Sequence, residues 1–588
     1  MINSKDNQTL SILNHSCAHL LAQAVKRLYP KALFWVGPVI SEGFYYDIDL
    51  GEESIKEEDL VTIEREMKKI SKDGKRIYRE EISKEEALKR FQDDPYKMEL
   101  LNAIDDTTVI SCYTQGEFTD LCRGPHVESV KQLKHFKLLK VSGAFFKGDV
   151  KNKMLQRIYG ICFETKEELE EYLKLLEEAK LRDHRKIGKE LDLFCFSDLV
   201  GAGLPMFTPR GTIIKEELQK EVERICKENG FQKVFNPHLA SIKLYEISGH
   251  AAKFSDELFH VSSSKGHDMV LKPVLCPHHT QLYASKTRSY RDLPIRYMES
   301  EKQYRAELPG AVSGLSRVYA ITVEDGHCFC RVDQVKEEMI RIVNIIKDFY
   351  SRFGLWDSKW VSLSLRDPLT PEKYIGSDQD WEICEKMLEE VSNQLGLEAI
   401  RCEGEAALYG PKLDFMFKDA MGREIQIPTV QLDFATPKRF ELVYINKDGG
   451  KTNPVMVHRA ILGSYERFMM LLIEHFAGAL PLWLSPVQVN IVPVNDLYHI
   501  DYCYQIKERL AKEDIRVEVD DHKQKLNYKI RQSNLYKNPY TLIIGDKEKE
   551  NNTISYRLLG SKDTITLSIE QFLLKVKNEI NNRVIELS

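Results

Sequence analysis

The stretch KPVLCPHHTQLYAS, residues 272–285, constrains the fold of this 588-residue chain more than any other feature of its sequence. It places the thiol of Cys276 two residues before the imidazoles of His278 and His279. A structural zinc site needs four ligands, and no CxxC pair occurs anywhere in the sequence. If a metal binds at Cys276, its other ligands must therefore come from distant segments that the fold brings together.

The overall composition is that of an ordinary soluble protein, with 43% hydrophobic and 30% charged residues. Lysine and arginine number 84 against 90 acidic residues, a net charge of −6, so no global basic field indicates nucleic acid, although a local basic groove remains compatible with it. Twelve cysteines without framework spacing predict reduced thiols and a cytoplasmic location. The polar start MINSKDNQTL lacks the build of a signal peptide, and the longest apolar stretch is too interrupted for a transmembrane helix.

The alternation of helix and strand signals predicts a multidomain α+β chain. We expect an α+β domain at 1–162, a connecting helix at 163–188, a mixed α+β domain with antiparallel strands at 189–484, and a small doubly wound α/β domain at 485–588. Thr165 and Glu168 form a capping-box pattern at the start of the connecting helix. An internal surface helix of one larger domain is an alternative interpretation of that segment.

Two stretches resemble the signature motifs of class II aminoacyl-tRNA synthetases. PIRYMESEKQYRAELPGAVSGLSRVYAITVEDGH resembles motif two, with Arg305 and Glu307 on one strand and Arg317 on a second. VMVHRAILGSYERFMMLL resembles motif three, in which Gly463 to Arg467 open a helix, and VERICKENGFQKVFNPHL resembles motif one. The resemblance implies an antiparallel-sheet catalytic core and an ATP-dependent ligase.

The finer similarity is to threonyl-tRNA synthetases of the bacterial type with an editing domain, without the small extreme N-terminal domain that many relatives carry. It implies one zinc per chain, held by Cys276, His327 and His458, whereas His279 matches a family histidine that is not a ligand. Three ligands leave a coordination position open. In the family that position takes the amino group and hydroxyl of threonine, and valine, which lacks the hydroxyl, is rejected.

The same resemblance assigns the remaining catalytic positions. Arg305 is expected to bind the carboxylate and α-phosphate, and Arg467 the outer phosphates, because a guanidinium suits phosphate oxygens. The expected ATP and catalytic residues, with Mg²⁺, are Arg305, Glu307, Arg317, Lys412, Gln426 and Arg467. The expected threonine contacts are Asp325, Tyr409 and Gln431, and His250 is expected to assist transfer to tRNA.

Serine keeps the hydroxyl of threonine and lacks one methyl, a difference of only about 1–3 kcal/mol. A second, hydrolytic site is therefore expected. HSCAH puts His15 and His19 one helical turn apart, and FTDLCRGPHV adds Cys122 and His126. The resemblance implies hydrolysis of seryl-tRNA(Thr) here, together with Lys97 and Asp120. A metal-free site is the preferred interpretation, and a zinc site and a purely structural cluster stay open.

The segment DDHKQKLNYKIRQSNLYK combines basic and aromatic side chains, a pattern that suits an unpaired RNA loop. Its position after motif three favours anticodon binding over a solvated charged face. The expected anticodon residues are Lys523, Lys525, Lys529 and Arg531.

The resemblance thus implies a threonine–tRNA ligase that edits seryl-tRNA(Thr), and the cysteine usage predicts that it is cytoplasmic. Its expected partners are tRNA(Thr), ATP, L-threonine and a second copy of the chain, since motif one usually forms the class II dimer interface. The alternative is an activation-deficient synthetase-like paralogue that acts as an RNA-binding or regulatory protein. Departures from the usual family residues at His278, Ile321 and Val323 motivate that alternative.

Overall fold

The computed structural model describes residues 4–587, except 6, 106–107, 150, 267, 309 and 420–421. The chain divides into two compact units, one ending at residue 178 and one beginning at residue 179. The expected α+β organisation with an antiparallel core is confirmed. The predicted domain boundaries at 162, 188 and 484 divide the chain into more parts than these two units, and they stay predictions. No helix in the described part of the chain is long and apolar enough to cross a membrane.

The first unit is built on a five-stranded sheet and a smaller three-stranded sheet. The strands of the larger sheet are β1 (Leu33–Phe34), β2 (Val39–Ile40), β3 (Gly43–Asp49), β8 (Met154–Phe163) and β7 (His135–Phe145). The smaller sheet contains β4 (Ile77–Ile82), β5 (Ile110–Gln115) and β6 (Phe118–Leu121). The apolar sides of helices α1 (Gln8–Leu28) and α2 (Leu60–Asp73) share one core with the larger sheet.

Helix α1 carries the predicted HSCAH pattern, and the structure shows why its position is fixed. Asn7 caps the helix by accepting a hydrogen bond from the Leu10 amide at 3.1 Å. The buried side chain of Asn14 donates to the Cys162 carbonyl on β8 at 3.0 Å and accepts from the Cys162 amide at 2.9 Å. This paired bond fixes the rotation of α1 against the sheet, so His15 and His19 present one defined face.

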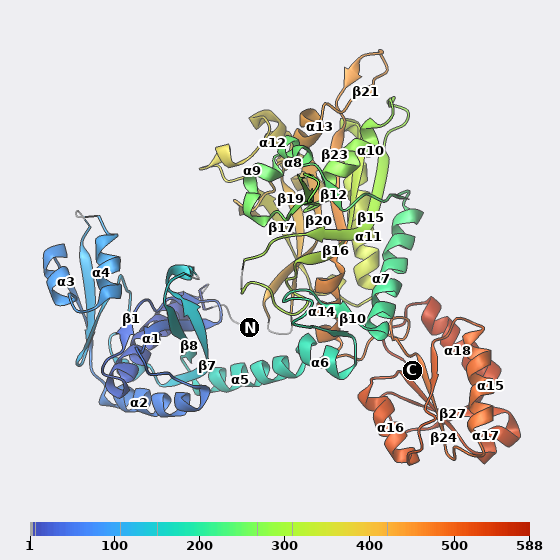
Figure 1. Ribbon diagram of the computed structural model, residues 1–588, viewed down its shortest axis with the longest axis horizontal. Coiled ribbons are helices and arrows are strands. Elements are labelled where there is room, and N and C mark those ends of the chain that lie inside the picture. The colour runs from blue at the N-terminus through green and yellow to red at the C-terminus, as the bar shows by residue number, and fades with distance from the viewer. Residues whose placement is uncertain are drawn as a thin grey trace. The chain divides into compact units, whose positions relative to one another are not determined.

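The second unit contains an eight-stranded sheet that is antiparallel except at its two edges. In spatial order the strands are β11 (Gln232–Lys233), β15 (Ile295–Tyr304), β16 (Ala320–Cys330), β23 (Val455–Ser464), β20 (Glu424–Asp433), β19 (Lys412–Lys418), β17 (Trp360–Leu365) and β18 (Ile400–Glu403). The main core packs this sheet against α7 (Pro209–Glu228), α11 (Val335–Ser351) and α14 (Tyr465–His475) (Figure 1). A separate apolar cluster includes side chains of α10 (Cys276–Ala284) and of β15, β16 and β23.

The connecting segment is two helices rather than the single predicted helix. Helix α5 (Lys166–Leu181) begins with the expected capping box, in which the Glu168 amide donates to the Thr165 hydroxyl at 3.2 Å. A second helix, α6 (His184–Glu190), starts after a break. The Asp183 carboxylate accepts from the Arg185 amide at 2.8 Å, so this residue caps a new helix instead of continuing the first.

The motif-two residues also lie differently from the prediction. Strand β15 ends at Tyr304 and β16 begins at Ala320, so Arg305, Glu307 and Arg317 lie in the connecting loop rather than on the strands. The ladder ends because the Ala306 amide donates to the Glu257 carbonyl at 2.9 Å instead of to β16. By contrast, Gly463 and Ser464 end β23 and Arg467 lies in the first turn of α14, as motif three predicts.

Residues from 485 onward form the expected alternation of strands and helices. Strand β24 (Val489–Pro493) pairs in parallel with both β25 (Val517–Val519) and β26 (Tyr540–Ile544). Helix α16 (Leu526–Leu535) lies on one side of this sheet and α15 (Ile500–Ala511) on the other (Figure 1). Two further strands, β27 (Thr553–Leu558) and β28 (Ile565–Ser568), extend the sheet antiparallel, which the sequence patterns did not indicate.

A buried ion pair lies at a bulge between β16 and β23. The register shifts between Glu324 and Gly326, and the Arg459 guanidinium fills the space, bonded to Glu324 and 4.6 Å above the Phe231 ring. A Cβ atom on Gly326 would lie 2.6 Å from Arg459 Nε and 2.6 Å from the Tyr297 carbonyl oxygen, so only glycine fits. Arginine and glutamate are both fully buried, which makes each dependent on the other.

We predict that Arg459→Met lowers the free energy of unfolding of the second unit by about 3–5 kcal/mol, because it leaves the Glu324 carboxylate buried without its partner. Urea unfolding followed by tryptophan fluorescence measures the loss. Arg401→Ala, which removes an exposed pair with Glu389, is the control and should leave the midpoint nearly unchanged. Equal midpoints for the two variants would contradict the prediction.

Candidate functional sites

Three potential metal ligands converge on the open face of the eight-stranded sheet. Cys276 begins α10, His327 lies on β16 and His458 on β23, and one donor atom from each lies within 4.8 Å of the others. All three side chains are buried. Burial raises the pKa of the Cys276 thiol well above its usual value and lowers that of His327 well below. A cation is what such a thiol needs to ionise, so the donor set fits a metal ion.

The two histidines are oriented by further groups. His458 Nε2 lies 2.9 Å from the Asp433 carboxylate, which leaves its Nδ1 for a metal. His327 Nδ1 lies 2.7 Å from Nδ1 of His279, which leaves its Nε2. Asp433 was not identified from the sequence, although it follows Gln431 by two residues in the same strand.

A cavity of about 360 Å³ adjoins this cluster. Its lining includes five of the predicted residues, namely His250, Arg305, Tyr409, Lys412 and Gln431. The Tyr409 ring stacks on the His458 ring with centroids 4.4 Å apart, and its hydroxyl donates to Gln431 at 2.7 Å. One wall of the cavity is thus shared with the metal cluster.

Positive charge is concentrated beside the cavity. Burial lowers the pKa of Arg467, and the neighbouring Arg305 and Arg317 lower it further. Arg467 donates to the carbonyl oxygens of Ser316 and Gln426 at 3.3 Å each, and Arg317 pairs with Glu307 at 2.7 Å. Three guanidinium groups that repel one another are stabilised by an anion, so this region suits a polyphosphate.

Lys412 and Gln426 both point to Asp414. The lysine ammonium lies 2.6 Å from one carboxylate oxygen and the Gln426 amide donates to the other at 2.6 Å. Lys412 also lines the cavity, whereas the backbone carbonyl of Gln426, rather than its side chain, contacts Arg467.

Asp325 lies on the metal side of β16, with its carboxylate 3.9 Å from His327 Nε2. Burial raises its pKa to about 7. His278 does not belong to the ligand cluster. Its ring lies 6.3 Å from that of Tyr245, and its buried Nδ1 makes no hydrogen bond among the described residues.

In the first unit the predicted hydrolytic cluster is assembled. Cys122 Sγ lies 3.2 Å from His15 Nε2 and 3.1 Å from His126 Nε2, and the His19 ring lies 4.4 Å from that of His126. Ser16, between the two helix histidines, contacts His126 Nδ1 at 3.1 Å and was not identified from the sequence.

A buried Lys97–Asp120 pair at 2.5 Å lies beside this cluster. Burial lowers the pKa of His15 and His19, and it lowers that of His126 to about 2. All three imidazoles are therefore neutral near pH 7 and able to accept hydrogen bonds.

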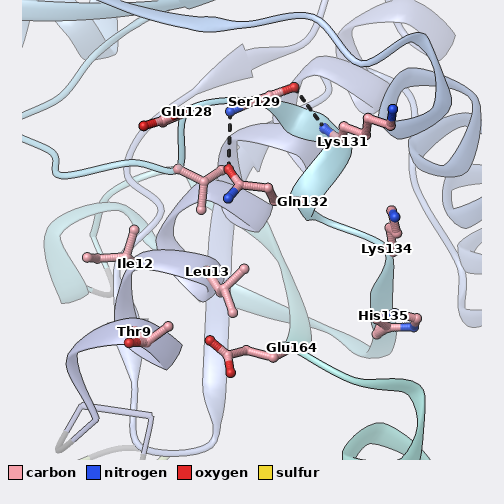
Figure 2. A pocket seen from close by; sticks show the side chains of 11 residues that line it. Thr9, Ile12, Leu13, Glu128, Ser129, Lys131, Gln132, Lys134, His135 and Glu164 are labelled. Carbon is pink, nitrogen blue, oxygen red and sulfur yellow. Dashed lines mark hydrogen bonds between the residues drawn. The ribbon is translucent and has the colours of Figure 1, made fainter.

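A cavity of about 670 Å³ in the same unit is separate from that cluster's donor atoms. It lies between the start of α1 and the segment that follows His126, as Figure 2 shows. Polar and charged side chains line most of it, including Glu128, Lys131, Lys134 and Glu164. None of the predicted functional residues lines it.

The C-terminal domain contains a cavity of about 330 Å³. Its lining includes Glu518, His522, Tyr528, Gln532, Tyr536 and Asn538. The side chains of Lys523, Lys525 and Arg531 are exposed, and these residues are close in sequence to the residues that line the cavity. Lys529 differs from the prediction because its side chain is buried and bonded to Asp496 and to the Asp520 carbonyl, so it holds two loops together. These lining residues all lie within 518–538, largely inside the basic and aromatic segment identified from the sequence, in which only the lysines and the arginine were expected to contact RNA.

Models of three protein families match the chain: the tRNA synthetase class II core domain (G, H, P, S and T) at 259–476, the anticodon binding domain at 488–579, and the threonyl and alanyl tRNA synthetase second additional domain at 110–159. The threonine–tRNA ligase of Geobacillus sp. (strain WCH70) is 48% identical over 97% of this chain and 89% of its own length. Threonine–tRNA ligase 1 of Bacillus subtilis is 46% identical over 98% and 90%.

Solved structures agree with these relatives. The RNA binding domain of threonyl-tRNA synthetase from Cryptosporidium parvum Iowa II superposes with a TM-score of 0.64 at 31% identity, over 68% of this chain and 98% of that one. Prolyl-tRNA synthetase from the same organism, at 17% identity and a TM-score of 0.52, shares the fold. The near-full-length identity does not favour the activation-deficient alternative. The class II core, the editing domain and the anticodon-binding domain, all of them present here, show that the chain belongs to the threonine–tRNA ligases.

Proposed function

We propose that Cys276, His327 and His458 hold one zinc ion, on which L-threonine is selected. The observation that supports this most directly is the convergence of their donor atoms within 4.8 Å beside the cavity that Tyr409 lines. Zinc, when bound, supplies a Lewis acid for the amino group and hydroxyl of threonine. Asp325 is positioned to accept a hydrogen bond from that hydroxyl. Valine leaves the carboxylate and the coordination position unpaired, which costs binding free energy.

The activation step joins the threonine carboxylate to the α-phosphorus of ATP, with pyrophosphate leaving. Arg305 holds the carboxylate and α-phosphate, and Arg467 with Arg317 holds the outer phosphates, accompanied by Mg²⁺. The mutual repulsion of the guanidinium groups supports this role, since charge that develops on phosphate oxygens relieves it. Catalysis by this arrangement is mainly positioning and charge stabilisation.

For transfer to tRNA(Thr) we propose that His250 helps remove the proton of the terminal ribose hydroxyl. Burial lowers its pKa to about 4, so the imidazole is neutral near pH 7. Its Nδ1 lies 2.9 Å from the Ser248 hydroxyl, which orients the ring. The opposite ring nitrogen is then available at the cavity that His250 lines.

In the first unit we propose that His15, His19, Cys122 and His126 position a water molecule and the ester of seryl-tRNA(Thr) for hydrolysis. The three neutral imidazoles provide hydrogen-bond acceptors that can orient the water molecule. Lys97 lies beside the cluster in an ion pair with Asp120, so the two charges largely cancel. A metal-free site remains our proposal.

We propose that the C-terminal cavity binds anticodon bases while Lys523, Lys525 and Arg531 contact phosphates. Polar side chains such as Gln532 and Glu518 on the lining suit hydrogen bonds to base edges.

We further propose a homodimer formed through motif one, because β11 is an edge strand of the sheet and the nearby Phe235 ring is 73% exposed. The twelve free thiols support a cytoplasmic location.

Replacing Cys276 by alanine should remove zinc and reduce threonine-dependent ATP–pyrophosphate exchange at least about 100-fold, because two ligands hold zinc poorly. Zinc per chain and exchange are measured on the same sample. Cys195→Ala, which changes an exposed thiol, should keep one zinc per chain and full exchange. Normal exchange by the Cys276 variant would refute the zinc mechanism.

Substituting Cys122 or His126 by alanine should slow hydrolysis of preformed seryl-tRNA(Thr) by about 100-fold or more and leave threonine activation unchanged. Because the pKa of His126 is lowered to about 2, its protonation should not reduce the wild-type rate as pH falls from 8 to 6. Deacylation is followed with radiolabelled serine. A chelator that abolishes deacylation would show that this cluster holds a metal.

The double variant Lys523→Ala, Lys525→Ala should bind tRNA(Thr) with a shallower salt dependence, the slope falling by about 0.7 per lysine that contacts a single-stranded phosphate. Filter binding at several salt concentrations gives the slope. An unchanged slope in the double variant would place the RNA elsewhere.

Lys529→Met should instead lower the thermal stability of the domain, because it leaves Asp496 without its buried partner.

A further inference from the structure

His279 lies directly behind one of the proposed zinc ligands. It is fully buried, its ring stands edge-on to that of His327 with centroids 4.7 Å apart, and the two Nδ1 atoms are 2.7 Å from each other. Its other nitrogen, Nε2, lies 3.3 Å from the Glu299 carboxylate on β15. A continuous line of groups therefore runs from a buried carboxylate through one imidazole to the next.

The distances restrict where the protons are. Two nitrogens 2.7 Å apart need one proton between them. If His279 donated it, His279 Nε2 would be a bare lone pair facing a carboxylate, and neutral His327 would carry its own proton on Nε2, the atom that must bind zinc. If His327 donates it, His279 Nε2 carries a proton toward Glu299, and His327 Nε2 is free. Only the second arrangement satisfies the carboxylate and the metal together.

The carboxylate of Glu299 is itself held in place. It accepts hydrogen bonds from the Asn236 amide and from the Asn236 side chain, each at 2.7 Å, and the buried Lys272 ammonium lies 3.8 Å away. Burial raises the pKa of Glu299, but bonds from His279 and Asn236 and the charge of Lys272 outweigh this and lower it overall. The group at the end of the line is therefore a fixed anion.

We propose that Glu299 and His279 are positioning residues for the catalytic metal, which select the zinc-binding tautomer of His327 through the chain Glu299–His279–His327. This inference rests on the zinc site of the proposed function. The other ligand, His458, is oriented by Asp433 directly, whereas His327 is oriented through a second imidazole. The histidine of the Cys-Pro-x-His stretch thus has a defined task without being a ligand.

The decisive variants separate charge, hydrogen bonding and packing. Glu299→Gln removes the anion and offers an amide that can face either tautomer of His279. His279→Gln keeps one donor and one acceptor, both on its terminal amide, and His279→Leu keeps bulk alone. His278→Gly changes the neighbouring buried histidine, which lies outside the ligand cluster, and is the matched control.

Zinc affinity is measured by competition with a chelator, and ligand geometry by the visible absorption of the cobalt-substituted protein, with thermal melting as the check on folding. We expect about 10–100-fold weaker zinc binding and an altered cobalt spectrum for Glu299→Gln and His279→Leu. We expect His279→Gln to bind substantially more tightly than His279→Leu, and His278→Gly to match the wild type.

Two outcomes would overturn the inference. Folded Glu299→Gln and His279→Leu proteins with wild-type zinc affinity and cobalt spectra would refute the positioning role while leaving the zinc site intact. A wild-type protein that binds no zinc would refute the proposed zinc mechanism, and the positioning role with it. These results are distinguished by the wild-type zinc content alone.

Discussion

The register of four neighbouring antiparallel strands is the constraint on which the catalytic site depends. His327 on β16 lies opposite His458 on β23, and His458 lies opposite Gln431 on β20. Residues that face each other across antiparallel strands project from the same side of the sheet. On β15, Glu299 lies opposite Asp325. A slip of one residue in any pairing would turn its side chains to the other face and dismantle the site.

The bulge in β16 lets this strand pairing accommodate a buried ion pair on the opposite face of the sheet. There the buried Arg459–Glu324 pair occupies the space that Gly326 leaves, while the neighbouring residue His458 faces the metal cluster. The same short segment of β23 therefore contributes one side chain to the core side and one to the site. The stability of the sheet and the geometry of the ligands are consequences of the same local pairing.

Burial decides the protonation state in both functional regions. It lowers the pKa of His126 to about 2 and that of His250 to about 4, and it raises that of Cys276. Neutral imidazoles can accept hydrogen bonds, and a protonated thiol needs a cation before it can act as a ligand. The cluster of the first unit and the proposed zinc site both consist of histidine and cysteine side chains. We propose different chemistry for them because the neighbouring residues differ. The Lys97–Asp120 ion pair lies beside the first cluster, whereas the carboxylates of Asp433 and Asp325 lie beside the second.

Local patterns in the sequence determined the elements and the motif signatures. The helix of HSCAH, the capping box at Thr165 and the parallel strands after residue 488 follow from side-chain periodicity and hydrogen-bonding groups within a few residues. Resemblance to a family supplied the expected ligands and motif residues. These patterns missed interactions between distant segments. Lys529 lies in a basic run and was expected to contact RNA, yet its side chain pairs with Asp496, 33 residues away in the sequence. The Glu299–His279–His327 line and the role of Asp433 were decided only by tertiary structure, because strand register and burial depend on contacts between segments that no local pattern records.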